Sequence, residues 1–136
     1  NERLMMYGFS LGASAVCELT SKPRSLEPSK IMLESPFASA EVMINDGSGL
    51  ALPGSFFVNL KVDNAEEIKN VNQDLFWVHG SDDDFLNINT HGEIVYKNHG
   101  GKYKEAHRVE GANHSDVPFV MGYENYLAAL REFTAR

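Results

Sequence analysis

Short apolar runs alternate with helical patterns along the chain. Each run is only a few residues long and ends near glycine, proline or acidic residues, which is typical of strands. The expected strands are residues 4–7, 31–33, 75–80 and 103–109. Because the run 75–80 (LFWVHG) is apolar on both of its alternating faces, we expect it to be buried on both sides of a parallel sheet.

Apolar residues at helical spacing lie between and after these runs. The clearest pattern begins at Gly122, where apolar and aromatic residues recur every three or four positions as far as Phe133. The expected helices are residues 12–19, 40–44, 64–71, 90–99 and the segment from 122 onward. Right-handed crossovers turn this order into a mostly parallel sheet with helices on both faces. The predicted fold class is therefore α/β, with about four strands in one domain spanning 1–136.

Composition and charge exclude several classes of partner. The 136 residues carry 12 Lys and Arg against 19 Asp and Glu, a net charge of −7, which argues against nucleic-acid or anionic-membrane binding. No apolar run reaches the roughly 20 residues that a membrane-spanning helix needs. Cys17 is the single cysteine, so no internal disulfide can form. The sequence assigns no cellular compartment.

One segment suggests a nucleophile. Residues 8–12 (GFSLG) fit the pattern G-x-S-x-G on a predicted strand-to-helix turn, which would hold the Ser10 hydroxyl above the sheet edge. Glycine is expected at 8 and 12 because side chains there would collide with the neighbouring strand and helix. The Leu11 N–H would donate to an oxyanion. The alternative is a strand that merely ends in glycine and serine.

A nucleophilic serine needs a histidine base and a carboxylate that orients it. The loop HGSDDDF (79–85) offers three aspartates, which could instead form a solvated acidic turn or a cation site. A calcium loop would need a closing glutamate that is missing here, so we expect no metal. Among the histidines, His114 in the loop EGANHSD is the best base. His79 is interpreted as packed or hydrogen-bonded, and the others as surface or structural: His91, His99 and His107.

Together these segments resemble the C-terminal half of the α/β-hydrolase superfamily, from the nucleophile onward. YGFSLGAS resembles the nucleophile elbow, LFWVHGSDDDFLN the strand that precedes the catalytic acid, and VEGANHSDVP the histidine loop. In the family, two residues separate the His-Gly pair from the acid, and the matching position here is Asp83. The resemblance implies a catalytic triad of Ser10, Asp83 and His114, with the Leu11 N–H in the oxyanion hole and no cofactor.

The same resemblance implies a serine hydrolase that cleaves an ester, thioester or amide through an acyl-enzyme intermediate. The implied substrate is a small ester or amide, or a peptide. Two alternatives remain: an acyltransferase on the same triad, or a non-catalytic fragment that associates with a partner chain.

The family's sheet begins with strands ahead of the elbow. We therefore expect a partial domain whose partner is the N-terminal portion of the same fold, including the loop that supplies the second oxyanion donor. Residues 37–60 are expected to form a small cap or loop insertion, in which GLALPGSFF (49–57) would make an apolar wall.

Overall fold

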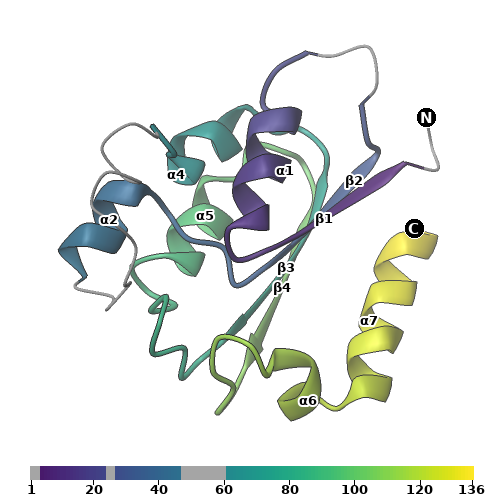
Figure 1. Ribbon diagram of the computed structural model, residues 1–136. Coiled ribbons are helices and arrows are strands. Elements are labelled where there is room, and N and C mark those ends of the chain that lie inside the picture. Colours follow the sequence, from purple (N-terminus) through teal and green to yellow (C-terminus); the bar gives the residue numbers. More distant parts are fainter. Residues whose placement is uncertain (1–3, 24–26, 47–60) are drawn as a thin grey trace.

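The computed structural model describes residues 4–23, 27–46 and 61–136, and its centre is a four-stranded parallel sheet (Figure 1). The strands lie side by side in chain order: β1 (Met5–Phe9), β2 (Lys30–Glu34), β3 (Asp74–Gly80) and β4 (Lys104–Val109). All three strand pairs are parallel, and the register sets Phe9 beside Glu34 and Glu34 beside Val78. The carboxyl ends of the strands therefore meet at one edge of the sheet. The predicted α/β class is confirmed.

Helices cover both faces of this sheet (Figure 1). One face carries α1 (Gly12–Thr20), α4 (Asn64–Glu67), the 3₁₀ turn η1 (Ile68–Asn70) and α5 (Gly92–Asn98). The other carries α6 (Val117–Met121) and α7 (Tyr123–Ala135), while α2 (Ala40–Asn45) lies beside the carboxyl ends. Leu75 and Trp77 pack toward α1 and α5, whereas Phe76 and Val78 pack toward α7. Because successive side chains of a strand point to opposite faces, β3 is buried on both, as predicted.

Several element boundaries differ from the sequence-based expectation. β1 does not end at Gly8 but continues to Phe9, since Gly8 packs beneath the start of α1. The expected helix 64–71 divides into α4 and η1. A separate helix, α6, was not expected; Pro118 fits its first turn, and Gly122 separates it from α7 with φ of 84°.

Part of the expected cap falls on α2, and its remainder, residues 47–60, lies outside the described residues. Phe37 and Met43 pack against Leu86 in a small apolar cluster beside the carboxyl ends of the strands. Within the described ranges, no helix is both long and apolar enough to cross a membrane.

A buried carboxylate ties α7 to the sheet. Glu34, at the end of β2, is only 3% exposed and accepts hydrogen bonds from the hydroxyls of Tyr7 on β1 (2.5 Å) and Tyr126 on α7 (2.6 Å). Burial and the hydrogen bond to Glu34 raise the pKa of Tyr126 to about 12, and the same causes raise the pKa of Tyr7. Both hydroxyls are therefore held in the protonated, donating form.

We expect Tyr126→Phe to lower the free energy of unfolding at pH 7 by about 1.5 kcal/mol, because Glu34 loses one of two donors. An unfolded tyrosine ionises near pH 10, below the folded Tyr126. The stabilisation is thus complete below about pH 10 and is lost as the pH rises toward the folded pKa of about 12.

Urea unfolding at pH 7 and pH 11 measures this difference. The gap between wild type and Tyr126→Phe should narrow at pH 11, and a constant gap would contradict the assignment. Tyr123→Phe is the matched control, since Tyr123 lies on the same helix and is 62% exposed.

Candidate active site

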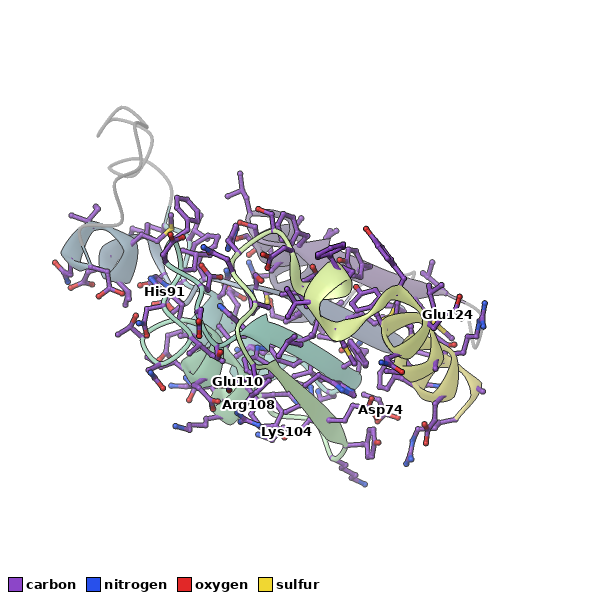
Figure 2. The ribbon with its side chains drawn as sticks, turned by 90° about the horizontal axis from the view of Figure 1, so that it is seen from below. Asp74, His91, Lys104, Arg108, Glu110 and Glu124 are labelled. Atoms are coloured by element: carbon purple, nitrogen blue, oxygen red, sulfur yellow. The ribbon has the colours of Figure 1, made fainter. Side chains whose placement is uncertain are left out.

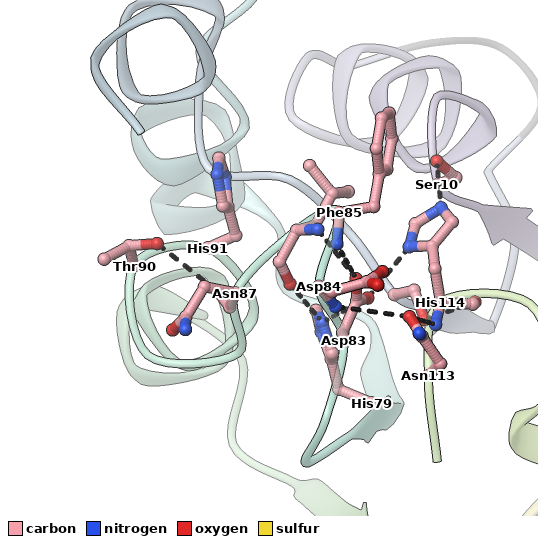
Figure 3. A network of polar contacts seen from close by, with 12 residues as sticks. Ser10, His79, Asp83, Asp84, Phe85, Asn87, Thr90, His91, Asn113 and His114 are labelled. Carbon is pink, nitrogen blue, oxygen red and sulfur yellow. Dashed lines mark hydrogen bonds and ion pairs between the residues drawn. The ribbon is translucent and has the colours of Figure 1, made fainter. Parts of the chain in front are cut away.

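Ser10 occupies a sharp turn between β1 and α1. Its N–H donates to Glu34 O at 2.9 Å, so the residue is still held by the sheet, but its φ of 51° lies in the left-handed region. A non-glycine residue in that region is strained and needs surrounding structure to hold it. The turn places the Ser10 hydroxyl at the carboxyl edge of the sheet, facing His114 (Figure 3).

The two glycines that flank this turn have different reasons to be glycine. A Cβ at Gly8 would lie 2.7 Å from both Ala13 Cα and Gly12 O, which are backbone atoms that cannot easily move. A Cβ at Gly12 would meet nothing within 4 Å. The expected crowding is therefore present at Gly8, and the expectation for Gly12 was wrong because the start of α1 faces open space.

His114 connects the turn to the loop after β3. Its Nε2 lies 2.9 Å from Ser10 Oγ and its Nδ1 lies 2.8 Å from Asp83 Oδ2 (Figure 3). The imidazole packs against the rings of Phe9 and Phe85, with centroid distances of 5.2 and 4.8 Å. Ser10, Asp83 and His114 thus form one continuous line of hydrogen bonds.

The backbone of the histidine loop is held by a second strained serine. Ser35 is fully buried directly after β2, has a φ of 45°, and donates from its hydroxyl to His114 O at 3.3 Å. Glu34-Ser35-Pro36 carried no expectation in the sequence. The hydrogen bond from Ser35 to His114 O joins residues 79 apart in the sequence, so only the structure reveals that Ser35 supports the histidine loop.

Asp83 is the aspartate of its loop that reaches His114. It is 4% exposed, and its Oδ1 accepts from the N–H groups of Phe85 (3.0 Å) and Leu86 (2.7 Å). Burial opposes ionisation of this carboxyl, but hydrogen bonds from His114, His79 and Leu86 outweigh it and hold the pKa of Asp83 well below its usual range. The site therefore contains a buried, charged acceptor at Nδ1 of His114.

The other two aspartates face solvent. Asp82 accepts from the Ser81 hydroxyl at 2.7 Å, and Asp84 donates its N–H to the Asn113 side chain at 3.2 Å. Neither carboxylate contacts the imidazole of His114 among the described contacts. Beside His114 lies an open depression of about 560 Å³ lined by Asp84, Phe85 and the loop 113–116.

Leu11 lies at the start of α1, one residue after Ser10. The N–H groups of Ala13 and Ser14 are bonded to Ser10 O and Leu11 O, whereas the N–H of Leu11 has no acceptor among the described residues. Leu11 is 55% exposed. A free N–H at a helix start can accept partial negative charge from a ligand.

The remaining histidines, interpreted from the sequence as surface or structural, occupy buried or half-buried positions. His91 is fully buried, with Nδ1 accepting from the Ala38 N–H at 3.1 Å, and burial lowers its pKa. Figure 2 shows it far from Asp74, which begins β3 at the opposite end of the sheet. His99 is buried at that opposite end, next to Gln73 O, and His107 is half-buried against Phe76.

Sequence reasoning missed the contact of His79 with the site. Its Nε2 lies 3.0 Å from Asp83 Oδ2 (Figure 3). The two residues are four apart on a strand-to-loop turn, and this spacing does not predict a contact between their side chains. Over the described part of the chain, no group of three or more His, Cys, Asp or Glu residues is placed to hold a metal ion.

No protein-family model matches the sequence, and no curated protein matches it. Solved structures do match the fold. An esterase of Pyrococcus furiosus is 21% identical, with a TM-score of 0.75, over 100% of this chain and 54% of that one. A bromoperoxidase of Bacillus anthracis is 13% identical, with a TM-score of 0.69, over 97% and 67%. The esterase domain of a Rhodothermus marinus protein is 14% identical, with a TM-score of 0.67, over 93% and 58%.

The chain has the α/β-hydrolase fold. It spans about half the length of the esterases that it matches. Within this fold, β1 to β4 lie in a continuous parallel block, and Ser10, Asp83 and His114 follow three different strands of it.

The two glycines provide a matched test of the turn. We expect Gly8→Ala to lower the free energy of unfolding by about 2–3 kcal/mol, since the added methyl group meets backbone atoms that must shift. Gly12→Ala should change it by less than about 0.5 kcal/mol, because the position is open. Urea denaturation of both variants measures this, and equal losses would show that the steric difference is absent.

Proposed function

We propose that this chain supplies the catalytic residues of a serine hydrolase that cleaves a carboxylic ester through an acyl-enzyme intermediate. The observation that carries the proposal is the line of hydrogen bonds from Ser10 Oγ through His114 to Asp83, at 2.9 and 2.8 Å. A serine hydroxyl is a weak nucleophile, and a neutral imidazole at this distance can remove its proton as it attacks.

In the first half-reaction, Ser10 Oγ forms a bond to the ester carbonyl carbon while its proton passes to His114 Nε2. The carbonyl π electrons move to oxygen and give a tetrahedral oxyanion. When this collapses, the carbon–oxygen bond to the leaving group breaks and His114 Nε2 returns the proton to the leaving oxygen. Asp83, charged and hydrogen-bonded to Nδ1, stabilises the imidazolium and holds the tautomer in which Nε2 is free.

Water then attacks the acyl-enzyme by the same route, with His114 again as base. The Leu11 N–H is the proposed oxyanion donor, since it follows Ser10 directly and has no other acceptor among the described residues. Removing one such donor commonly costs about 3 kcal/mol of transition-state stabilisation, or about a hundredfold in rate.

Two observations favour an ester as substrate. Several of the similar solved structures are esterases, and the open depression beside His114 includes the apolar ring of Phe85. Thioester or amide cleavage and transfer of the acyl group to an alcohol would use the same residues. Product analysis with a competing alcohol separates hydrolysis from transfer.

We also propose that the chain is one part of a larger α/β-hydrolase domain. β1 lies at an edge of the described sheet. Two of its aromatic side chains are partly exposed there, Tyr7 at 48% and Phe9 at 38%. An open, apolar edge strand favours pairing with another strand. A strand at that edge would also bring a loop close enough to Ser10 to supply a second oxyanion donor.

Labelling with a fluorophosphonate followed by mass spectrometry of the peptides tests the nucleophile. We expect the adduct on Ser10, because its Oγ is the hydroxyl that contacts His114 Nε2. Ser14 and Ser35 are internal controls, since their hydroxyls contact Asn64 and the His114 backbone instead.

Ser10→Ala and His114→Ala should both abolish labelling and ester turnover while the circular dichroism spectrum stays unchanged. An adduct on Ser14 or Ser35, or turnover retained by either variant, would contradict the proposed roles.

The acid can be tested by comparing the three neighbouring aspartates. Asp83→Asn should lower kcat by about 10⁴-fold, because an amide at this position favours the wrong imidazole tautomer. Asp82→Asn and Asp84→Asn should leave kcat nearly unchanged, since both side chains face solvent. Steady-state kinetics on a p-nitrophenyl ester measures the ranking, and a larger loss in either control would reassign the acid.

A further inference from the structure

His79 is a second histidine on the buried carboxylate of Asp83. It lies at the end of β3, is fully buried, and its Nε2 is 3.0 Å from Asp83 Oδ2 and 2.9 Å from Leu86 O (Figure 3). A backbone carbonyl only accepts hydrogen bonds, so Nε2 must carry the proton. The single Nε2–H of His79 is therefore shared, since it donates to Leu86 O and also lies within hydrogen-bond distance of Asp83 Oδ2.

The opposite side of the imidazole is closed. His79 Nδ1 has no hydrogen-bond partner among the described residues, and a Cβ at Gly92 would lie 2.1 Å from it. The ring therefore fits closely against Gly92, and its hydrogen-bonding contacts all lie on the Nε2 side. Two other titratable groups lie close enough to interact electrostatically with His79: His91 and Glu93.

We propose that His79 is a positioning residue, which fixes the Asp83 carboxylate in the orientation that holds His114 for reaction with Ser10. The inference rests on the proposed hydrolase function. The N–H groups of Phe85 and Leu86 hold Oδ1, and His79 and His114 share Oδ2. Each carboxylate oxygen thus has two donors, so rotation of the carboxylate would break bonds at both oxygens.

A comparison with His99 shows which feature carries the inference. His99 is also buried, also places Nε2 next to a backbone carbonyl (Gln73 O, 2.9 Å), and also has an unpartnered Nδ1. Its ring also packs against a glycine, Gly101, although through Cε1 and Nε2. It lies at the amino end of β3 and contacts no carboxylate in the described contacts. The role proposed for His79 therefore comes from its contact with Asp83 and not from its burial.

The test is a double-mutant cycle on the rate at which a fluorophosphonate modifies Ser10. We expect His79→Leu to slow modification about tenfold or more when Asp83 is present, because a small displacement of the acid misplaces the base. In an Asp83→Ala background the same change should matter less than about twofold, since its target is gone. Equal losses in both backgrounds would overturn the proposal and leave His79 a stabilising residue only.

Two further variants keep the test independent of folding defects. His79→Gln retains an N–H donor at a similar distance and should restore the rate to within about threefold of wild type. Gly92→Ala removes no polar group but should slow modification like His79→Leu, because its methyl group displaces the His79 ring. The matched controls, His99→Leu and Gly101→Ala, should leave the rate unchanged. A loss in His79→Gln as large as in His79→Leu would contradict the donor role.

Steady-state kinetics on p-nitrophenyl acetate adds a second readout. His79→Leu should lower kcat and leave KM within about twofold, since His79 does not touch the substrate in the proposed mechanism. A change confined to KM would overturn the proposal.

The contact between His79 and Asp83 can also be measured independently of any catalysis. The ¹⁵N spectrum of His79 should show the Nε2–H tautomer, and Asp83→Ala should move the Nε2 signal. An Nδ1–H tautomer, or an unmoved signal, would refute the geometry. If that signal moves while wild-type Ser10 stays unlabelled, the contact holds and the hydrolase proposal fails.

Discussion

Hydrogen bonding between the parallel strands continues one residue beyond β1, β2 and β3, and the candidate site depends on this extension. The N–H groups of Ser10, Ser35 and Ser81 donate to carbonyls of the next strand at 2.9, 3.0 and 2.9 Å. The chain therefore leaves all three strands at one level of the sheet, with positive φ at Ser10 and Ser35. Because of this common level, His114 meets both Asp83, 31 residues before it in the sequence, and Ser10, 104 residues before it. Slippage of any one strand would separate them.

A buried charge is the second constraint at this edge. An isolated carboxylate in an apolar interior would take up a proton rather than remain charged. Asp83 avoids this because four donors surround it, two from its own turn and two from imidazoles. The turn 83–86 forms around the carboxylate of Asp83. The same backbone N–H groups therefore shape the turn and stabilise the charge. In a nonpolar setting, a charge held in this way interacts with His114 more strongly than it would in water.

The sequence predicted the strands and the candidate site residues, because these follow from hydrophobic patterns, short motifs and their order along the chain. β3 was recognisable from its apolar run, and Ser10 and His114 from their motifs and chain order. Asp83 was chosen among three aspartates only through the resemblance to the α/β-hydrolase superfamily, and the catalytic roles of all three residues remain predictions. What it could not predict depends on side-chain contacts between distant segments. The Tyr126 contact with Glu34 spans 92 residues, and no periodicity encodes it. The difference between Gly8 and Gly12 depends on how closely α1 approaches β1. His79 and Asp83 are near in sequence, but their contact follows from how the turn folds.

The surroundings of the proposed base, His114, differ from those of the proposed oxyanion donor, the Leu11 N–H. His114 is enclosed by Asp83, the rings of Phe9 and Phe85, and the Ser35 hydroxyl below its backbone. The oxyanion side has no such enclosure, since Leu11 is 55% exposed beside an edge strand. Under the proposed function, proton transfer is therefore prepared within the described residues. Stabilisation of the oxyanion depends in addition on what covers β1, because a single N–H in contact with water contributes less than one in a dry site.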